Sequence, residues 1–200
     1  MTTASRISNL TDEERALLLH LAREAVSAAA AGRPLPKPDL SQLPASLTAA
    51  GACFVTLERG HELRGCTGTL LARAPLAEEV VRTAAQTALY DPRFNPVRPE
   101  EVGKLTIEIS VLTPPTRLDM KDPTRLPTMI RPGIDGVTLM RGRYRATFLP
   151  QVWEKIPDPI RFLDMLTQKM GLPSRAWAQK GMEAEIYQVE EFAEREPGRP

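Results

Sequence analysis

The chain has 200 residues, of which 42% are hydrophobic, and this is enough for one ordinary domain with a core or for one domain that carries a small lobe. Its 26 basic and 25 acidic residues leave a formal net charge of +1, so the general positive charge of a nucleic-acid-binding protein is missing. Residues 1–31 carry charges throughout, which excludes the apolar core of a signal peptide and a membrane span, and we expect a cytoplasmic protein.

A helix is predicted close to the N-terminus. Thr11 and Glu14 have the spacing of a capping box, in which each side chain accepts a hydrogen bond from the backbone of the other residue. Leucine and alanine then recur at helical spacing until Gly32. Residues 33–44 contain four prolines, so we expect an extended connector after the helix.

A β-hairpin is predicted next. Residues 53–57 are typical of a strand, and Gly60 begins a turn before a second strand. The returning strand contains Cys66 between Gly65 and Gly68. Glycine inside a strand often marks close approach of a ligand or of another backbone, so two glycines around one thiol indicate a shaped pocket.

The two cysteines of the chain, Cys53 and Cys66, fall on the two arms of this hairpin with offset register. We therefore expect free thiols, which suit a reducing compartment. In an unbulged strand Arg64 projects from the same face as Cys66 and would favour its thiolate form. The alternative is that Cys66 is a small buried residue without reactivity, and the sequence leaves both interpretations open.

The middle of the chain supplies three further candidates. A helix predicted over residues 75–89 is followed by Asp91 and Arg93. These two residues form either a turn with a paired arginine or an anion-binding group. Alternation over residues 105–111 predicts a half-buried strand, in which Glu108 is either solvated or orients a substrate.

The last third of the chain predicts a short helical turn, a second hairpin, a helix and a closing strand. These elements are expected, in that order, over residues 121–129, 137–149, 158–170 and 182–187. The sequence contains no glycine-rich nucleotide loop, no His-Glu-x-x-His and no cysteine pair at zinc spacing, so we expect neither a cofactor nor a metal.

Four segments resemble the AMMECR1 domain family. Residues 63–69 are similar to its signature Leu-Arg-Gly-Cys-Ile-Gly-Thr, with threonine where isoleucine is usual. Residues 91–94 resemble its Asp-x-Arg-Phe, residues 107–112 its hydrophobic strand and residues 148–152 its Phe-Leu-Pro-Gln-Val. The four blocks occur in the family's order, and the resemblance runs from about residue 10 to residue 192.

The resemblance implies an α+β fold with two unequal lobes and a cleft between them, and we expect a mixed sheet with packed helices. We expect a single domain over residues 10–192. Its main lobe would contain residues of about 10–112 and 158–192, and its smaller lobe residues of about 113–157. Residues 193–200 are expected to form a polar tail.

The first functional hypothesis is a cysteine-dependent or ligand-binding component for an anionic or carbonyl-bearing small molecule. Cys66 is the candidate nucleophile and Arg64 the candidate thiolate stabiliser. The candidate binding residues are Gly65, Thr67, Gly68, Asp91, Arg93, Glu108 and Gln151. The resemblance implies Memo-like and radical SAM proteins as partners.

Two other classes of function remain open on the sequence. One is a non-catalytic adaptor whose pocket receives a peptide or a partner protein. The other is RNA binding through the arginines near Arg141, which ranks last because the formal net charge of the chain is only +1.

Overall fold

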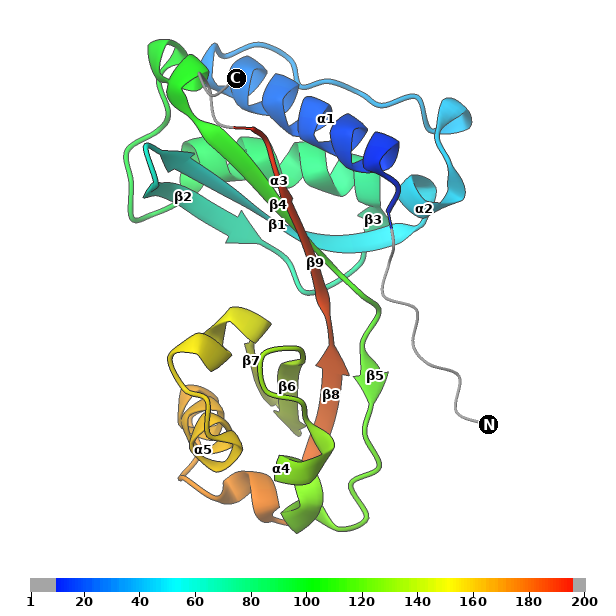
Figure 1. Ribbon diagram of the computed structural model, residues 1–200, viewed down its shortest axis with the longest axis vertical. Coiled ribbons are helices and arrows are strands. Elements are labelled where there is room, and N and C mark those ends of the chain that lie inside the picture. The colour runs from blue at the N-terminus through cyan, green and yellow to red at the C-terminus, as the bar shows by residue number, and fades with distance from the viewer. Residues whose placement is uncertain (1–9, 196–200) are drawn as a thin grey trace. The chain divides into compact units, whose positions relative to one another are not determined.

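The computed structural model describes residues 10–195 and has the expected α+β class (Figure 1). The described chain divides into two compact units. The first unit contains residues 10–112 and 190–195, and the second contains Thr113–Val189. No helix of the described residues is long and apolar enough to cross a membrane.

An antiparallel sheet forms the centre of the first unit. Its strand order is β2, β1, β4 and β9, and the short strand β3 pairs with the start of β1. The bounds are β1 (Ala50–Arg59), β2 (Glu62–Gly68), β3 (Ala74–Pro75), β4 (Thr106–Leu112) and β9 (Val189–Ala193). A mixed sheet was expected, but β1 lies between two strands that both run against it, so its main pairings are antiparallel.

The hairpin of β1 and β2 confirms the sequence prediction. Gly60 and His61 both have positive φ, 57° and 67°, as a two-residue type I′ turn requires. The turn pairs Arg59 with Glu62 and fixes the start of the register.

Two helices, α1 (Asp12–Ala30) and α3 (Leu76–Tyr90), pack together against one face of this sheet (Figure 1). The predicted capping box is present, with Glu14 N donating to Thr11 Oγ1 over 3.2 Å and Thr11 N donating to Glu14 Oε2 over 2.7 Å. Alternate residues of β1 and β4 face the helices and are fully buried, among them Val55, Leu57, Ile107 and Ile109. Short helices complete the unit: α2 (Ala45–Thr48) and 3-10 turns at Leu40–Gln42 and Pro99–Lys104.

Strand β9 was not predicted and ties the C-terminal segment to the first unit. After it, Glu194 N donates to the carbonyl of Ile107 over 2.9 Å, and the Glu194 carboxylate pairs with Arg23 of α1. Ala193 and Glu194 are therefore anchored to the first unit, although they fall in the segment that was predicted to be a polar tail. Residues 196–200 lie outside the described residues.

The second unit has its own antiparallel sheet, with strand order β5, β8, β6 and β7. Its elements are β5 (Thr116–Arg117), α4 (Leu126–Met129), β6 (Gly136–Arg141), β7 (Tyr144–Phe148), α5 (Pro159–Lys169), β8 (Glu183–Tyr187) and 3-10 turns at Pro123–Arg125, Pro150–Glu154 and Ala176–Ala178. The sequence predicted that residues 158–192 lie in the main lobe, but residues 158–189 do not. They belong to the second unit because Phe162 and Trp177 pack in its core with Trp153.

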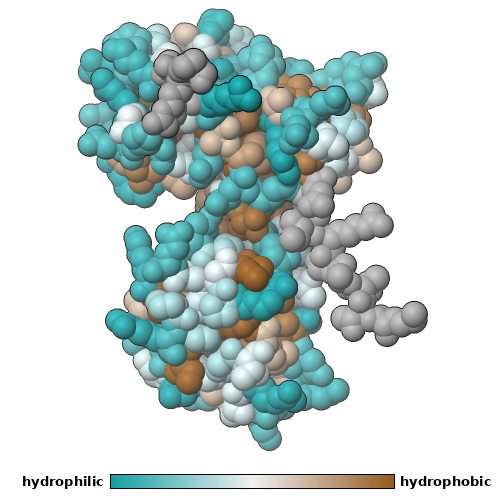
Figure 2. Space-filling view, viewed as in Figure 1, coloured by the Kyte–Doolittle hydropathy of each residue, from teal (hydrophilic) through white to brown (hydrophobic). Residues whose placement is uncertain are grey.

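Figure 2 shows a largely hydrophilic surface with hydrophobic residues at intervals. Large exposed apolar side chains occur in both units: Leu35, Leu63, Leu71 and Tyr90 in the first, and Ile134, Tyr144, Ile160 and Met165 in the second. They come from many separate elements, which is ordinary for a folded surface, and they do not by themselves mark an interface.

Candidate functional site

Cys66 lies in a row of three side chains that crosses the first sheet. It is opposite Thr56 of β1, and Thr56 is opposite Glu108 of β4. Directly opposed residues in an antiparallel sheet project from the same face, so the three side chains lie side by side on the face that α1 and α3 do not cover. Cys53 projects to the helix side and is fully buried, so the two thiols occupy opposite faces and no disulfide joins them.

The backbone of Cys66 is held on its outer side by Asp91 and Arg93, two residues that follow α3. Cys66 N donates to Asp91 Oδ2 over 2.8 Å, and Arg93 Nη2 donates to the Cys66 carbonyl over 2.9 Å. Strand β2 is an edge strand, whose outer N–H and C=O groups have no neighbouring strand. The two side chains take the place of that strand at Cys66.

Asp91 and Arg93 also pair with each other. Arg93 Nε donates to Asp91 Oδ1 over 3.0 Å and Arg93 Nη2 to Asp91 Oδ2 over 2.7 Å, a bidentate arrangement. The hydrogen bonds from Arg93 hold the pKa of the buried Asp91 carboxyl well below its usual range. The same pairing raises the pKa of Arg93, and the Cys66 thiol contributes in the same direction, so the cation lies within electrostatic reach of Cys66.

Thr56 completes the immediate surroundings of the thiol. Its Oγ1 donates to Cys66 Sγ over 3.4 Å, and the Cys66 side chain is half-buried. A hydroxyl donor and a nearby guanidinium both favour a thiolate over a thiol. The Cys66 sulfur thus lies beside one hydroxyl donor and within electrostatic reach of one guanidinium.

Arg64 does not have the position expected for it. The register shifts between Leu57 and Glu58, and Arg64 is the extra residue of the resulting β-bulge. Its Nε and Nη2 donate to the two oxygens of Glu101 over 3.3 and 3.2 Å. These bonds lower the pKa of the Glu101 carboxyl, and they attach β2 to the 3-10 turn that contains Glu101. The bulge removes the regular alternation on which the pairing of Arg64 with Cys66 was predicted.

Protein atoms fill the space beside both glycines of the motif. A Cβ atom on Gly65 would lie 3.0 Å from Thr87 Cγ2 of α3, and one on Gly68 would lie 2.5 Å from a ring atom of Phe54. Thr67 faces the helices, and its hydroxyl lies 2.6 Å from that of Thr87. Gly65, Thr67 and Gly68 thus bring α3 and Phe54 close to β2, and they do not surround an open pocket at the thiol.

Glu108 is half-buried on the same face as Cys66. Its burial raises the pKa of its carboxyl, and the neighbouring carboxylates of Glu191 and Glu58 raise it further. A carboxyl group of this kind holds its proton to higher pH than a solvated glutamate and is a stronger base once ionised.

The remaining candidates lie elsewhere. Gln151 belongs to the second unit, in the 3-10 turn Pro150–Glu154, and is half-buried. His20 lies on α1 beside Glu24, with 3.5 Å between Nε2 and a carboxylate oxygen, and His61 is exposed in the hairpin turn. Among residues 10–195 no group of three or more His, Cys, Asp or Glu side chains is placed to hold a metal ion.

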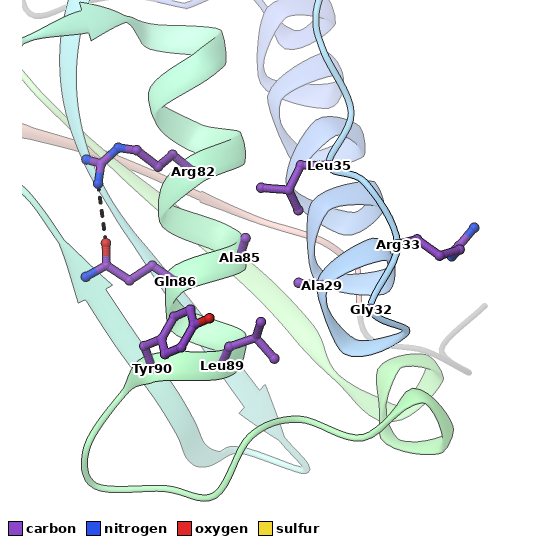
Figure 3. Close-up of a pocket in the computed structure, with 9 residues that line it drawn as sticks. All are labelled: Ala29, Gly32, Arg33, Leu35, Arg82, Ala85, Gln86, Leu89 and Tyr90. Atoms are coloured by element: carbon purple, nitrogen blue, oxygen red, sulfur yellow. Dashed lines mark hydrogen bonds between the residues drawn. The ribbon is translucent and has the colours of Figure 1, made fainter.

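A pocket of about 600 Å³ lies between α1 and α3, away from this row (Figure 3). Figure 3 shows Leu35 and Ala85 facing each other across the space between the helices, with Leu89 and Tyr90 at one end. The lining contains no thiol, carboxylate or imidazole group. This pocket combines apolar contact surface with the polar groups of Arg33, Arg82 and Gln86, and Tyr90 supplies its one group for acid–base chemistry.

The fold and the site define an α+β protein of two units, with an edge-strand cysteine that an Asp-x-Arg segment holds in place. The AMMECR1 family profile matches residues 19–192, and the chain belongs to this family. The chain is 35% identical to a protein of Thermofilum pendens over 206 residues, covering 96% of this chain and 94% of that protein. It is 37% identical to protein MK0488 of Methanopyrus kandleri over 196 residues, covering 96% and 93%.

A solved structure has the same fold. The crystal structure of protein PH0010 from Pyrococcus horikoshii matches with a TM-score of 0.82 at 34% identity, over 96% of each chain.

Proposed function

We propose that this chain binds a small molecule with a carbonyl or anionic group and acts on it through Cys66. The observation that supports the proposal is the Asp91–Arg93 ion pair, which bonds both backbone groups of Cys66. A nucleophile that is fixed in this way loses little freedom when a substrate binds. The partners in this proposal are Memo-like and radical SAM proteins, and its location is the cytoplasm, where thiols stay reduced.

Arg93 is the group that meets the substrate in this proposal. Its side chain is 53% exposed although it is anchored to a carboxylate that is 2% exposed. A guanidinium has five N–H donors, so those not used on Asp91 and on the Cys66 carbonyl remain for a carboxylate or a developing oxyanion. Arg93 thus takes the role of thiolate stabiliser that the sequence assigned to Arg64.

The second candidate is a non-catalytic adaptor. It is favoured by Leu63, an apolar residue that is 43% exposed on the edge strand β2, where a peptide or a partner protein finds both apolar and backbone contacts. In this case the Asp91–Arg93 pair serves to close the strand edge at Cys66.

Alkylation by iodoacetamide under native conditions tests the first proposal. Cys53→Ala protein restricts the reaction to Cys66, and Cys66→Ser in the same background is the control. We expect modification of native protein at neutral pH within minutes, and protection when a carbonyl-bearing ligand occupies the site. Modification that occurs only after denaturation contradicts the proposal. An adaptor instead retains its partner in pull-down experiments when Cys66 is replaced by Ala.

A further inference from the structure

We propose that Glu108 is the general base of the Cys66 site and takes a proton from a water molecule that attacks an acyl group carried on the Cys66 sulfur. This inference rests on the proposed function and narrows its substrate class to activated acyl compounds, such as esters and thioesters. The reaction that follows is thiol-dependent acyl transfer to water.

The register of the strands sets the distance between Cys66 and Glu108. The backbone groups of Cys66 bond to Asp91 and Arg93, so Cys66 and Thr56 form a non-hydrogen-bonded pair, with Cα atoms about 4.5 Å apart. Thr56 and Glu108 then form the hydrogen-bonded type of pair, about 5.5 Å apart. The sum places Cys66 and Glu108 about 10 Å apart at Cα with Thr56 between them, so in this proposal the acyl group and one water lie over the Thr56 side chain.

Two carboxylates attached to β2, those of Asp91 and Glu101, are held in ion pairs. Asp91 is bonded to Arg93 and to Cys66 N, and its lowered pKa makes it a weak base. Glu101 is bonded to Arg64 and to the backbone of Arg98, and its pKa is lowered too.

Neither histidine of the chain is placed to serve this row. His20 belongs to α1, which packs on the opposite face of the sheet, and it lies beside Glu24. His61 is exposed in the hairpin turn at the end of β1, beyond the register pair of Arg59 and Glu62. Among the carboxyl and imidazole groups of the first unit's described residues, Glu108 is the one in register with Cys66 and Thr56.

The surroundings of Glu108 strengthen it as a base. Its charged neighbours are Glu58, which is diagonal to it on β1, and Glu191 of β9, whose carboxylate accepts a hydrogen bond from Ser110 Oγ over 3.3 Å. Burial raises the pKa of Glu108 and these negative charges raise it further, whereas Arg93 lies beyond Cys66 at the edge of the sheet. The two ends of the row therefore differ: a cation favours the thiolate at one end, and carboxylates favour proton uptake at the other.

The reaction proceeds in two balanced steps with p-nitrophenyl acetate as the probe. In the first, the Cys66 thiolate attacks the ester carbon, an S–C bond forms, and the C–O bond breaks as p-nitrophenolate leaves with the electron pair. In the second, water attacks the thioester carbon, its proton passes to Glu108, and the S–C bond breaks to return the thiolate. The product is acetic acid, which ionises to acetate by losing its own proton to solvent, and Glu108 releases the proton it took from water.

Rapid-mixing kinetics of nitrophenolate release separate the two steps, because the first gives a burst and the second sets the steady rate. We expect a burst of about one nitrophenolate per chain in Cys53→Ala protein. Glu108→Gln in that background should retain the burst and lose about 100-fold in steady rate, the usual size of a general-base contribution. Mass spectrometry should show the acetylated Glu108→Gln protein accumulating. Cys66→Ser gives the background rate.

Glu58→Gln is the matched variant on the same face. It removes one negative neighbour of Glu108, so it should preserve the steady rate at high pH and move the acid limb of the pH profile to lower pH. Absence of a burst in folded protein contradicts the proposed function of Cys66. A normal burst with an unchanged steady rate in Glu108→Gln contradicts the role of Glu108 alone.

Discussion

Asp91 accepts a hydrogen bond of 2.8 Å from the backbone N–H of Cys66, although 25 positions separate the two residues in the chain. The bond attaches the end of α3 to the edge strand β2, and Arg93 completes it by donating to the Cys66 carbonyl. The position of the thiol therefore depends on a carboxylate that makes no contact with a substrate in the proposed mechanism.

Replacement of Asp91 by Ala should destabilise the protein by about 2–4 kcal/mol. The change leaves the Cys66 N–H and the Arg93 guanidinium without their acceptor in a site where Asp91 itself is buried. Urea unfolding measures the loss. The matched control is Asp119→Ala, because Asp119 pairs with Lys121 at the same spacing but both side chains are exposed. An equal loss in both variants contradicts a special role of Asp91.

The Asp91 carboxylate should also make the stability of the protein depend on pH in the acid range. In the folded state the pKa of Asp91 is lowered from its ordinary value of 3.8. The ionised carboxylate therefore contributes to stability in full above about pH 4, and this contribution is lost as the pH falls further. In Asp91→Asn protein the free energy of unfolding should fall less steeply below about pH 4 than in the parent. Urea unfolding at several acid pH values measures the free energy of unfolding of both proteins. If it falls equally steeply with pH in both, Asp91 does not cause the acid dependence.

Arg93→Gln should slow alkylation of Cys66 at pH 7 by about threefold, because it removes the cation that favours the thiolate. Arg64→Gln should change that rate much less, since the guanidinium of Arg64 is bonded to Glu101 in the bulge. Both variants are compared in Cys53→Ala protein with iodoacetamide in excess. A larger effect from Arg64 would restore the role that the sequence assigned to it.

Local signals in the sequence predicted the elements around the site. The capping box at Thr11, the turn at Gly60 and the alternation that contains Glu108 each specify structure within a few residues, and all three are present. The sequence grouped Asp91 and Arg93 with Cys66 only as candidate residues of one functional hypothesis. Their hydrogen bonds to the Cys66 backbone had no local signal.

Long-range pairing accounts for what the sequence did not predict. The bulge at Arg64 depends on how β2 is aligned with β1, and one extra residue changes which side chains share a face. Thr56 was not singled out for the same reason, since only the register places it between Cys66 and Glu108. Strand β9 joins the sheet beside β4, after the whole second unit has intervened.

Gly68→Ala should destabilise the protein by about 1–3 kcal/mol through overpacking. The added Cβ would lie 2.5 Å from both the Cys53 carbonyl oxygen and a ring atom of Phe54. Phe54→Ala should rescue only part of the loss, because the backbone oxygen of Cys53 stays in place. The control is Gly103→Ala, where a Cβ meets no atom within 4 Å. Urea unfolding of the four proteins measures these losses. If Phe54→Ala restores all of the stability that Gly68→Ala removes, the predicted clash with the Cys53 carbonyl oxygen is contradicted.

Tyr187→Phe should alter the stability of the protein in alkali. The Tyr187 ring is buried beside Gly136, and its hydroxyl donates to the carbonyl of Phe148 over 3.2 Å. Burial raises the pKa of Tyr187 from 10.0 to about 12, so its contribution to stability is complete below pH 10 and is lost as the pH rises toward 12. At pH 7 the variant should lose about 1 kcal/mol with its hydrogen bond.

Between pH 10 and pH 12 the free energy of unfolding should therefore fall less steeply in Tyr187→Phe than in the parent protein. Burial also raises the pKa of Cys53 to about 12, so part of the alkaline slope should remain in the variant and should disappear when Cys53→Ala is added. The control is Tyr90→Phe, which changes a tyrosine that is 73% exposed and should leave the slope of the parent unchanged. Urea unfolding at pH 7, 10 and 11 measures the slopes, and parallel curves for Tyr187→Phe and the parent would show that the Tyr187 hydroxyl ionises as readily in the folded chain as in the unfolded one.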